Sequence, residues 1–210
     1  LLAKKVQDLH TFMHLVVRDL TQEEEQILDG YIYKVYEEFG ITDDNDSIFI
    51  PGTRQYKKFP LLGDLYEAIK DDPVLKKVAN ILIPLVTGSL SVYNHETNVD
   101  LTNKYIVFDM NGTKGQNLIL SLFITLDFVW SKIKENRLQK KAVFIDEAWQ
   151  LIGSKSNEMA AEYVKEIFKT IRAFGGSAFV MTQEINDFFS LNDGEYGKAI
   201  IGNSDTKIVL

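Results

Sequence analysis

The sequence predicts an α/β fold in which a parallel β-sheet is flanked by helices. Short apolar runs of strand length occur at residues 105–109, 142–146 and 178–182, and a fourth begins at residue 207. The segments between the first three runs carry apolar residues at helical spacing and are long enough for several helical turns. Strands that alternate with helices in this way form parallel sheets, and the helices cover both faces of the sheet.

The first part of the chain, residues 1–39, is predicted to form two helices. Apolar residues recur at helical spacing over residues 3–19. Thr21 and Glu24 then have the spacing of a capping box, in which each side chain accepts a hydrogen bond from the other residue's backbone N–H. A second helix should therefore begin there, and Gly40 should end it.

Residues 40–104 are predicted to form a mostly helical insertion instead of a strand–helix–strand unit. Two short stretches at helical spacing, 61–70 and 73–86, support this prediction, and Pro73 suits the first turn of the second stretch. No run of β-branched residues in this segment has the length of a central strand. The insertion should therefore pack beside the sheet and add no strand to it.

Two features resemble metal sites but have simpler interpretations. His10 and His14 are four residues apart, a spacing at which two helical histidines can share a metal; partly buried histidines are the alternative, since the sequence places no acidic third ligand. The loop Asp43–Asp46 echoes a calcium loop, but it lacks the glycine and distal glutamate of an EF-hand, so we interpret it as a turn. The chain has no cysteine, which excludes disulfides, thiolate zinc sites and cysteine nucleophiles.

Residues 105–210 carry the α/β part of the prediction. One amphipathic helix, around residues 118–133, should connect the first two strands. Another helix, at 157–174, should connect the second and third strands. A helical and loop stretch then leads to the fourth strand, which begins at Lys207.

The strongest chemical signal is the run from Ala142 to Glu147, which consists of four apolar residues followed by two carboxylates. It predicts a central strand with Asp146 and Glu147 at its carboxyl end, the edge at which open α/β sheets bind ligands. In this arrangement, known as Walker B, Asp146 would hold Mg²⁺ through water, and Glu147 would polarise the water that attacks the γ-phosphate of ATP. The alternative is a strand whose final Asp-Glu pair only caps the next helix.

Side chains at the other element ends fit the same site. Thr182 and Gln183 end the next strand, where they could bind a γ-phosphate or the catalytic water, unless Thr182 only caps a helix and Gln183 is only exposed. Arg172 could reach the ATP of a neighbouring subunit as an arginine finger, or it could only favour a helix carboxyl end. Asp109 could support the site from a second layer, or it could cap the turn that follows it.

The phosphate-binding loop itself does not occur in this sequence, which contains no G-x-x-x-x-G-K-[ST] motif. The stretches 112–115 and 194–198 have the wrong spacing, and Lys198 is followed by an alanine instead of a hydroxyl residue. We therefore expect the loop to precede Leu1 in a longer protein from which both ends of this chain are cut. The chain alone should neither bind ATP tightly nor hydrolyse it, because most phosphate contacts come from that loop.

The composition limits the classes of partner. The chain has 23 basic and 30 acidic residues, a net charge of −7, which argues against broad nonspecific binding of nucleic acid by this piece alone. No apolar run reaches transmembrane length, and no signal peptide is recognisable. The absence of cysteine fits a reducing cytosol.

Taken together, these motifs resemble those of the VirB-four family, the large ATPases of type IV secretion and conjugation machines. The Asp-Glu-Ala-Trp run at residues 146–149 is the most specific part of the likeness. The family usually has a basic residue after the arginine that matches Arg172, whereas this sequence has Ala173. Four stretches carry the resemblance in the family's order: Leu20–Glu24, Thr97–Leu101 running into Val107–Asp109, Val143–Leu151, and Thr182-Gln183.

The resemblance implies a RecA-like P-loop ATPase core with a helical insertion, of which the first strand and the phosphate-binding loop lie outside this chain. It implies ATP and Mg²⁺ as ligands and a homo-oligomer, a hexamer, located in the cytoplasm at the inner face of the cell membrane. Such a motor would contact membrane components of a secretion channel and would power conjugative DNA transfer, pilus assembly or export, with DNA as a possible ligand.

Two other functions stay open on the sequence. One is a related hexameric DNA-pumping ATPase, such as a coupling protein or a HerA/FtsK-like translocase, which the Walker B and glutamine arrangement would also fit. The other is a noncatalytic interaction module with the same fold. The presence of both Asp146 and Glu147 argues against the second, because an inactive motor has no need of the second carboxylate.

Overall fold

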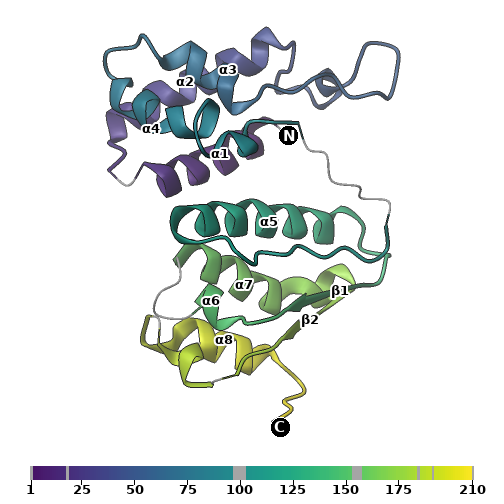
Figure 1. The fold of residues 1–210 in the computed structure, drawn as a ribbon. Helices are drawn as coiled ribbons and strands as arrows, with labels where there is room; N and C mark the ends of the chain where they lie inside the picture. Colours follow the sequence, from purple (N-terminus) through teal and green to yellow (C-terminus); the bar gives the residue numbers. More distant parts are fainter. Residues whose placement is uncertain are drawn as a thin grey trace. The chain divides into compact units, whose positions relative to one another are not determined.

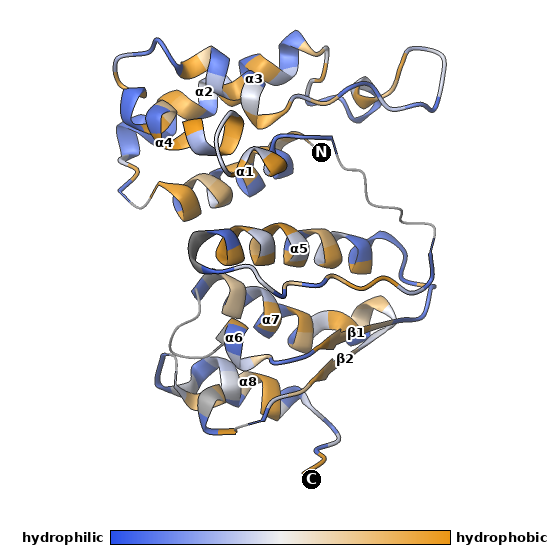
Figure 2. Cartoon of the chain, in the orientation of Figure 1, coloured by the Kyte–Doolittle hydropathy of each residue, from blue (hydrophilic) through white to orange (hydrophobic). Residues whose placement is uncertain are grey.

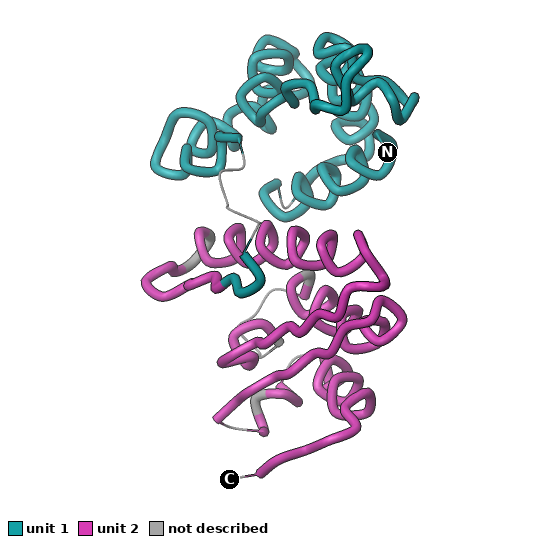
Figure 3. Tube along the Cα trace, turned by 90° about the vertical axis from the view of Figure 1, so that its right-hand side faces the viewer, with its two compact units in different colours: residues 1–106 teal, residues 107–210 magenta. Residues whose placement is uncertain are grey.

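The computed structural model describes residues 2–17, 19–96, 103–152, 158–183, 185–190 and 192–209. The chain forms two compact units, residues 1–106 and residues 107–210 (Figure 3). The two opening helices and the segment predicted as a separate insertion belong to the same unit, and the sheet belongs to the other.

The regular structure of the first unit is helical (Figure 1). In the described residues 40–96 the pairing of strand type is limited to an isolated bridge between Phe49 and Tyr56. The helices are α1 (Leu2–Val16), α2 (Gln22–Glu38), α3 (Leu62–Ile69) and α4 (Lys76–Val86), with short 3₁₀ helices η1 (Asn45–Ile48) and η2 (Ser91–Tyr93).

The two ends of α2 follow the local signals of the sequence. The Thr21 N–H donates to Glu24 Oε2 at 2.8 Å, and the Glu24 N–H donates to Thr21 Oγ1 at 3.2 Å, which confirms the predicted capping box. The backbone hydrogen bond from Thr21 lowers the pKa of the Glu24 carboxyl. Gly40 follows the last turn in a left-handed conformation with φ of 70°, which a glycine adopts without steric cost.

Pro73 does not begin α4, contrary to the sequence prediction. Helix α4 starts at Lys76, and Pro73 lies in the turn before it. Asp72 organises this turn, because its Oδ1 accepts the backbone N–H groups of Val74 at 2.8 Å and Leu75 at 3.2 Å. Aspartate side chains often close turns in this way. The helix therefore begins beyond the two residues whose N–H groups Asp72 accepts.

His10 and His14 face acidic residues of α2 that the sequence analysis did not place near them. His10 Nε2 lies 2.9 Å from Asp29 Oδ1, and His14 Nε2 lies 3.2 Å from Glu25 Oε1. His10 is partly buried as expected, whereas His14 is exposed. No group of three or more His, Asp or Glu side chains in the described part of the chain has the geometry of a metal site. The pair therefore helps to join α1 to α2.

The second unit contains a parallel two-stranded sheet with helices packed against it (Figure 1). Strand β1 (Lys141–Ile145) pairs with β2 (Gly176–Val180) from Lys141 opposite Gly176 to Ile145 opposite Val180. Both strands and the two long helices agree with the prediction. The helices are α5 (Gly115–Glu135), α6 (Trp149–Ile152), α7 (Glu158–Thr170) and α8 (Glu195–Asn203), with 3₁₀ helices η3 (Ile171–Phe174), η4 (Ile185–Phe189) and η5 (Asn192–Gly194).

One face of this sheet is covered and the other is open. Both strands are predominantly hydrophobic in Figure 2. On the open face, the rings of Phe144 and Phe179 stack with their centroids 4.6 Å apart, and they are 62% and 47% exposed. The expectation that helices cover both faces is therefore wrong for the described residues. The covered face packs on a core of Leu126, Trp130, Ile145, Ala148, Val164, Ile167, Ile171 and Ile200.

The first and last predicted strands do not form. Residues 105–109 contain no strand, and Tyr105 and Val107 are exposed. Residues 207–209 also lack regular structure, and Ile208 and Val209 are exposed. A strand needs a neighbour that completes its backbone hydrogen bonds, and neither segment pairs with β1 or β2. None of the described helices combines the length and apolar character that crossing a membrane would require.

Lys141 joins three elements at the end of the sheet where the strands begin. Its Nζ donates hydrogen bonds to the carbonyl oxygens of Ile133, Asn136 and Phe174, which lie in or just after the last turn of α5 and at the end of η3. These carbonyls lie where a helix leaves its last acceptors unpaired. The lysine at the start of β1 therefore fastens the carboxyl ends of two helical segments to the sheet.

Candidate functional site

The two predicted motifs meet at the carboxyl edge of the sheet. Asp146 and Glu147 directly follow β1, and Thr182 and Gln183 lie two and three residues beyond the end of β2. Because the strands are parallel and adjacent, both motifs leave the sheet at the same edge. The structure therefore brings Glu147 and Gln183 into direct contact across 36 positions of sequence.

Glu147 is the centre of this contact. Its Oε1 accepts a hydrogen bond from Gln183 Nε2 at 2.6 Å, and its Oε2 accepts one from Trp149 Nε1 at 2.6 Å. The backbone of Glu147 has φ of 49°, a left-handed conformation that is uncommon for any residue other than glycine. Such conformations cluster at functional sites, where surrounding contacts hold them in place.

Backbone hydrogen bonds fix the turn that carries Glu147. The Met181 N–H donates to the Ile145 carbonyl at 2.9 Å, which continues the pairing of the two strands past the end of β2. The Ala148 N–H then donates to the Met181 carbonyl at 3.0 Å, and Ala148 itself is fully buried. These bonds tie the residues on both sides of Glu147 to the neighbouring segment. The turn therefore projects the glutamate from a rigid frame.

Asp146 offers a carboxylate at the same edge. It is exposed, and its Oδ1 accepts the Glu147 N–H at 2.9 Å. A single aspartate with free access to water suits Mg²⁺, a cation that prefers oxygen ligands and keeps several of its waters. The described residues provide no cluster of three or more acidic or histidine ligands that would hold a metal alone. The donor set fits a metal that is shared with substrate phosphates.

The other predicted site residues lie elsewhere or have different partners. Thr182 is half-buried beside Gln183. Arg172 lies in η3, at the end of the sheet where β2 begins, and its exposed guanidinium is 3.4 Å from Asp205 Oδ2. Asp109 does not end a strand, contrary to the prediction; its Oδ1 accepts the Asn111 N–H at 2.8 Å, which is the turn cap of the alternative interpretation.

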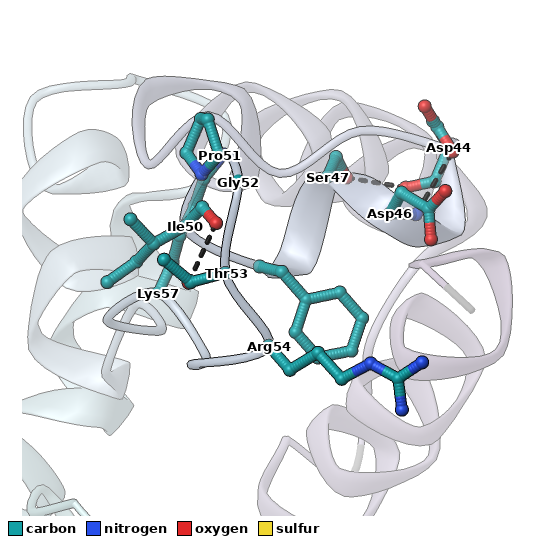
Figure 4. A pocket seen from close by; sticks show the side chains of 10 residues that line it. Asp44, Asp46, Ser47, Ile50, Pro51, Gly52, Thr53, Arg54 and Lys57 are labelled. Atoms are coloured by element: carbon teal, nitrogen blue, oxygen red, sulfur yellow. Dashed lines mark hydrogen bonds between the residues drawn. The ribbon is translucent and has the colours of Figure 1, made fainter.

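A surface cavity of about 660 Å³ lies in the first unit, over residues 44–57 (Figure 4). Asp44 Oδ1 accepts the Asp46 N–H at 3.0 Å there, which supports the interpretation of the acidic loop as a turn. Thr53 Oγ1 donates to the Ile50 carbonyl at 2.9 Å. None of the residues assigned to the Walker B site lines this cavity. It therefore carries no part of the chemistry predicted from the sequence.

Trp149 is the site residue that the sequence analysis missed. The sequence places it two residues after Glu147, where it entered only as part of the family motif. A partly buried tryptophan usually finds an acceptor for its indole N–H, and the nearest acidic side chain in the sequence is that of Glu147. The sequence alone does not show that Trp149 is partly buried or that the turn brings the two side chains together.

Comparisons with known proteins agree with this architecture. The TraG P-loop domain family matches residues 65–210, more than half of the chain. The chain is 29% identical to Protein TraC of Escherichia coli (strain K12) over 110 residues, which cover 51% of this chain and 12% of TraC. The structure of VirB4 of Thermoanaerobacter pseudethanolicus superimposes with a TM-score of 0.75 at 28% identity, covering 94% of this chain and 54% of VirB4.

These comparisons confirm the predicted α/β P-loop ATPase fold and the resemblance to the VirB-four family. One of the stretches that suggested the resemblance, residues 97–101, lies outside the described residues. The chain spans about half of the VirB4 structure and a smaller part of TraC. By the extent of the family match, the chain belongs to the TraG P-loop domain family.

Proposed function

We propose that these 210 residues are part of an ATP-hydrolysing motor that powers conjugative DNA transfer or type IV secretion. One observation carries the proposal: Gln183 Nε2 lies 2.6 Å from Glu147 Oε1 at the carboxyl edge of two adjacent parallel strands, next to the exposed Asp146. A carboxylate pair and a glutamine at this edge are the groups that P-loop enzymes use around an attacking water.

Each residue then has a distinct role. Glu147 accepts the proton of the water that attacks the γ-phosphate, and Gln183 hydrogen-bonds that water or the phosphate. Asp146 would hold Mg²⁺ through water, and the ion would supply positive charge to the phosphates. Thr182 contributes to nucleotide contacts beside Gln183. The loop that cradles the phosphates is not encoded in these residues, so tight ATP binding belongs to the parent protein.

Assembly supplies the remaining part of the proposal. Arg172 lies at the opposite end of β2 from Gln183, so it would act on the ATP of a neighbouring subunit in a homo-oligomer, a hexamer. Its contact with Asp205 is a surface ion pair of 3.4 Å between two exposed side chains, which contributes little stability and exchanges readily. We place the assembled motor at the inner face of the cell membrane, in contact with components of a secretion channel.

The test is the steady-state ATPase activity of the full-length parent protein carrying Glu147→Gln. This change keeps the size of the side chain and removes the carboxylate, so kcat should fall by about 10²-fold or more while nucleotide binding persists. Asp146→Ala should instead weaken the Mg²⁺-dependent part of nucleotide binding. A binding titration with and without Mg²⁺ separates the two effects.

Glu135→Gln is the matched control. Glu135 lies at the end of α5, is exposed, and contacts Lys132 in a surface ion pair at 2.7 Å. It should leave both kcat and nucleotide binding unchanged. Hydrolysis by Glu147→Gln at the rate of the unmodified protein would show that Glu147 is not the catalytic carboxylate.

A further inference from the structure

The two hydrogen bonds to Glu147 differ in their surroundings. The bond from Trp149 Nε1 to Oε2 is partly buried, whereas the bond from Gln183 Nε2 to Oε1 is exposed. Both measure 2.6 Å. Each carboxylate oxygen can accept two hydrogen bonds, so each retains one further acceptor direction. Water can compete for the glutamine bond more easily than for the tryptophan bond.

Trp149 also lies next to residues that are buried in the core. It is the first residue of α6, and the residues around it anchor that short helix in the core: Ala148 is fully buried and Leu151 is 6% exposed. The Gln150 N–H donates to the Glu147 carbonyl at 2.9 Å, which closes the turn beneath the glutamate. Gln183 lies on an exposed segment beyond the end of β2.

The backbone of Glu147 makes a second support necessary. A left-handed φ of 49° turns the chain sharply between β1 and α6, and the glutamate side chain still has three rotatable bonds beyond that turn. The turn alone therefore does not determine where the carboxylate points. The indole N–H of Trp149 fixes one of its two oxygens.

We infer that Trp149 is the positioning residue of the Walker B glutamate. It holds Oε2 of Glu147 through its partly buried N–H, so that Oε1 can exchange its exposed bond with Gln183 for one with the attacking water while the carboxylate stays in place. This inference rests on the proposed function, because it assigns Trp149 a role in the same hydrolysis. In this role Trp149 acts through Glu147 and is not required to bind the water or the phosphate.

The test uses Trp149→Phe in the full-length parent protein. The change keeps an aromatic ring in α6 and removes the N–H donor. We expect kcat for ATP hydrolysis to fall by about 10-fold or more with KM nearly unchanged. Without the indole N–H the Glu147 carboxylate can shift, and even a small shift misaligns it with the attacking water. Trp149→His, which keeps a ring N–H, should recover part of the lost kcat. A loss of packing would instead affect both variants equally.

Trp130→Phe is the matched control, since it makes the same replacement in the same unit. Trp130 lies in the core, where its ring packs edge-on against the ring of Phe174 with the two ring centroids 5.6 Å apart. It can lower stability, but it should leave kcat of the folded protein unchanged. Circular dichroism spectra identify any variant that does not fold, and kcat is compared only among folded variants.

A double mutant isolates the role of the tryptophan. If Trp149 acts through Glu147, adding Trp149→Phe to Glu147→Gln should lower kcat no further, because residues that act as one unit are not additive. If the fold-reductions in kcat of the two single variants multiply in the double variant, the inference about Trp149 is wrong. It is also wrong if Trp149→Phe keeps the wild-type kcat while Glu147→Gln is impaired. Neither result would contradict the proposed function. Wild-type activity of Glu147→Gln would overturn the proposed function first.

Discussion

Replacing Lys141 with methionine should lower the free energy of unfolding of the second unit by about 2–3 kcal/mol. Lys141 Nζ donates to three carbonyls that close α5 and η3, those of Ile133, Asn136 and Phe174. The bonds to Ile133 and Phe174 are partly buried, and the bond to Asn136 is exposed. Methionine keeps most of the side-chain length and removes all three donors.

The magnitude follows from the surroundings of each bond. A net hydrogen bond contributes about 1 kcal/mol, so the two partly buried bonds together contribute about 2 kcal/mol. The exposed bond is replaced by water at little cost. A cation near the carboxyl end of a helix adds about 0.3–1 kcal/mol through the helix dipole. The total is a small number of kcal/mol, which is a large part of the stability of a domain of this size.

Urea unfolding followed by tryptophan fluorescence measures this change. The two tryptophans of the chain, Trp130 and Trp149, both lie in the second unit, so their fluorescence follows that unit alone. The adjacent Lys140 is exposed and has no hydrogen-bond or ion-pair partner within the described residues, so Lys140→Met serves as the control and should change stability by less than about 0.5 kcal/mol. Equal midpoints for the two variants would refute the claim that Lys141 fastens the helix ends.

Two further predictions concern the first unit. Burial, with a contribution from the Asp8 carboxylate, raises the pKa of Tyr36 from 10.0 to about 12. The stability that the neutral side chain contributes is therefore fully present below about pH 10. Roughly 2–3 kcal/mol of the free energy of unfolding should be lost as the pH rises through about 12. Denaturant unfolding across this range, beside a tyrosinate absorbance titration, checks this, and Tyr36→Phe should abolish the dependence attributed to this residue; an unchanged profile in that variant would contradict it. Thr21→Ala removes one bond of the capping box and should lower the free energy of unfolding by about 1 kcal/mol, measured by denaturant unfolding followed by far-ultraviolet circular dichroism. The control Thr11→Ala, in the interior of α1, should lower it by less. Equal losses in the two variants would show that the cap contributes nothing of its own.

The parts of the fold that the sequence predicted correctly depend on local signals. Helix α5 has a long apolar stripe, and helix α2 is capped by Thr21 and Glu24, which are only three positions apart in the sequence. Strands β1 and β2 are apolar runs between two helical segments, and both form as predicted. In each case the information that selects the structure lies within one element or between neighbours in the sequence.

The errors occurred where the outcome depends on distant partners. Residues 105–109 have the same apolar strand-length pattern as β1, but they have no neighbouring strand in the described residues and stay irregular. The acidic partners of His10 and His14 come from α2, which the spacing within α1 does not reveal. Hydrophobic pattern indicates what a segment can form, and pairing across the fold decides whether it does.

The candidate site divides in the same way. The position of Asp146 and Glu147 at a strand end was predictable from the apolar run that precedes them. The shared edge with Gln183 followed from the expected parallel arrangement. The bond from Trp149 to Glu147 was not predicted, because it depends on a left-handed turn that no local residue preference favours at a glutamate.

That left-handed turn has a consequence for protein design. A non-glycine residue in this conformation costs about 1–2 kcal/mol relative to glycine, which has no Cβ to clash with its own backbone. A sequence optimised on this backbone for thermal stability alone would therefore place glycine or asparagine at position 147. Such a redesign would relax the turn and remove the carboxylate on which Trp149 and Gln183 converge. Stabilising versions of this chain should hold position 147 fixed and seek their gains elsewhere.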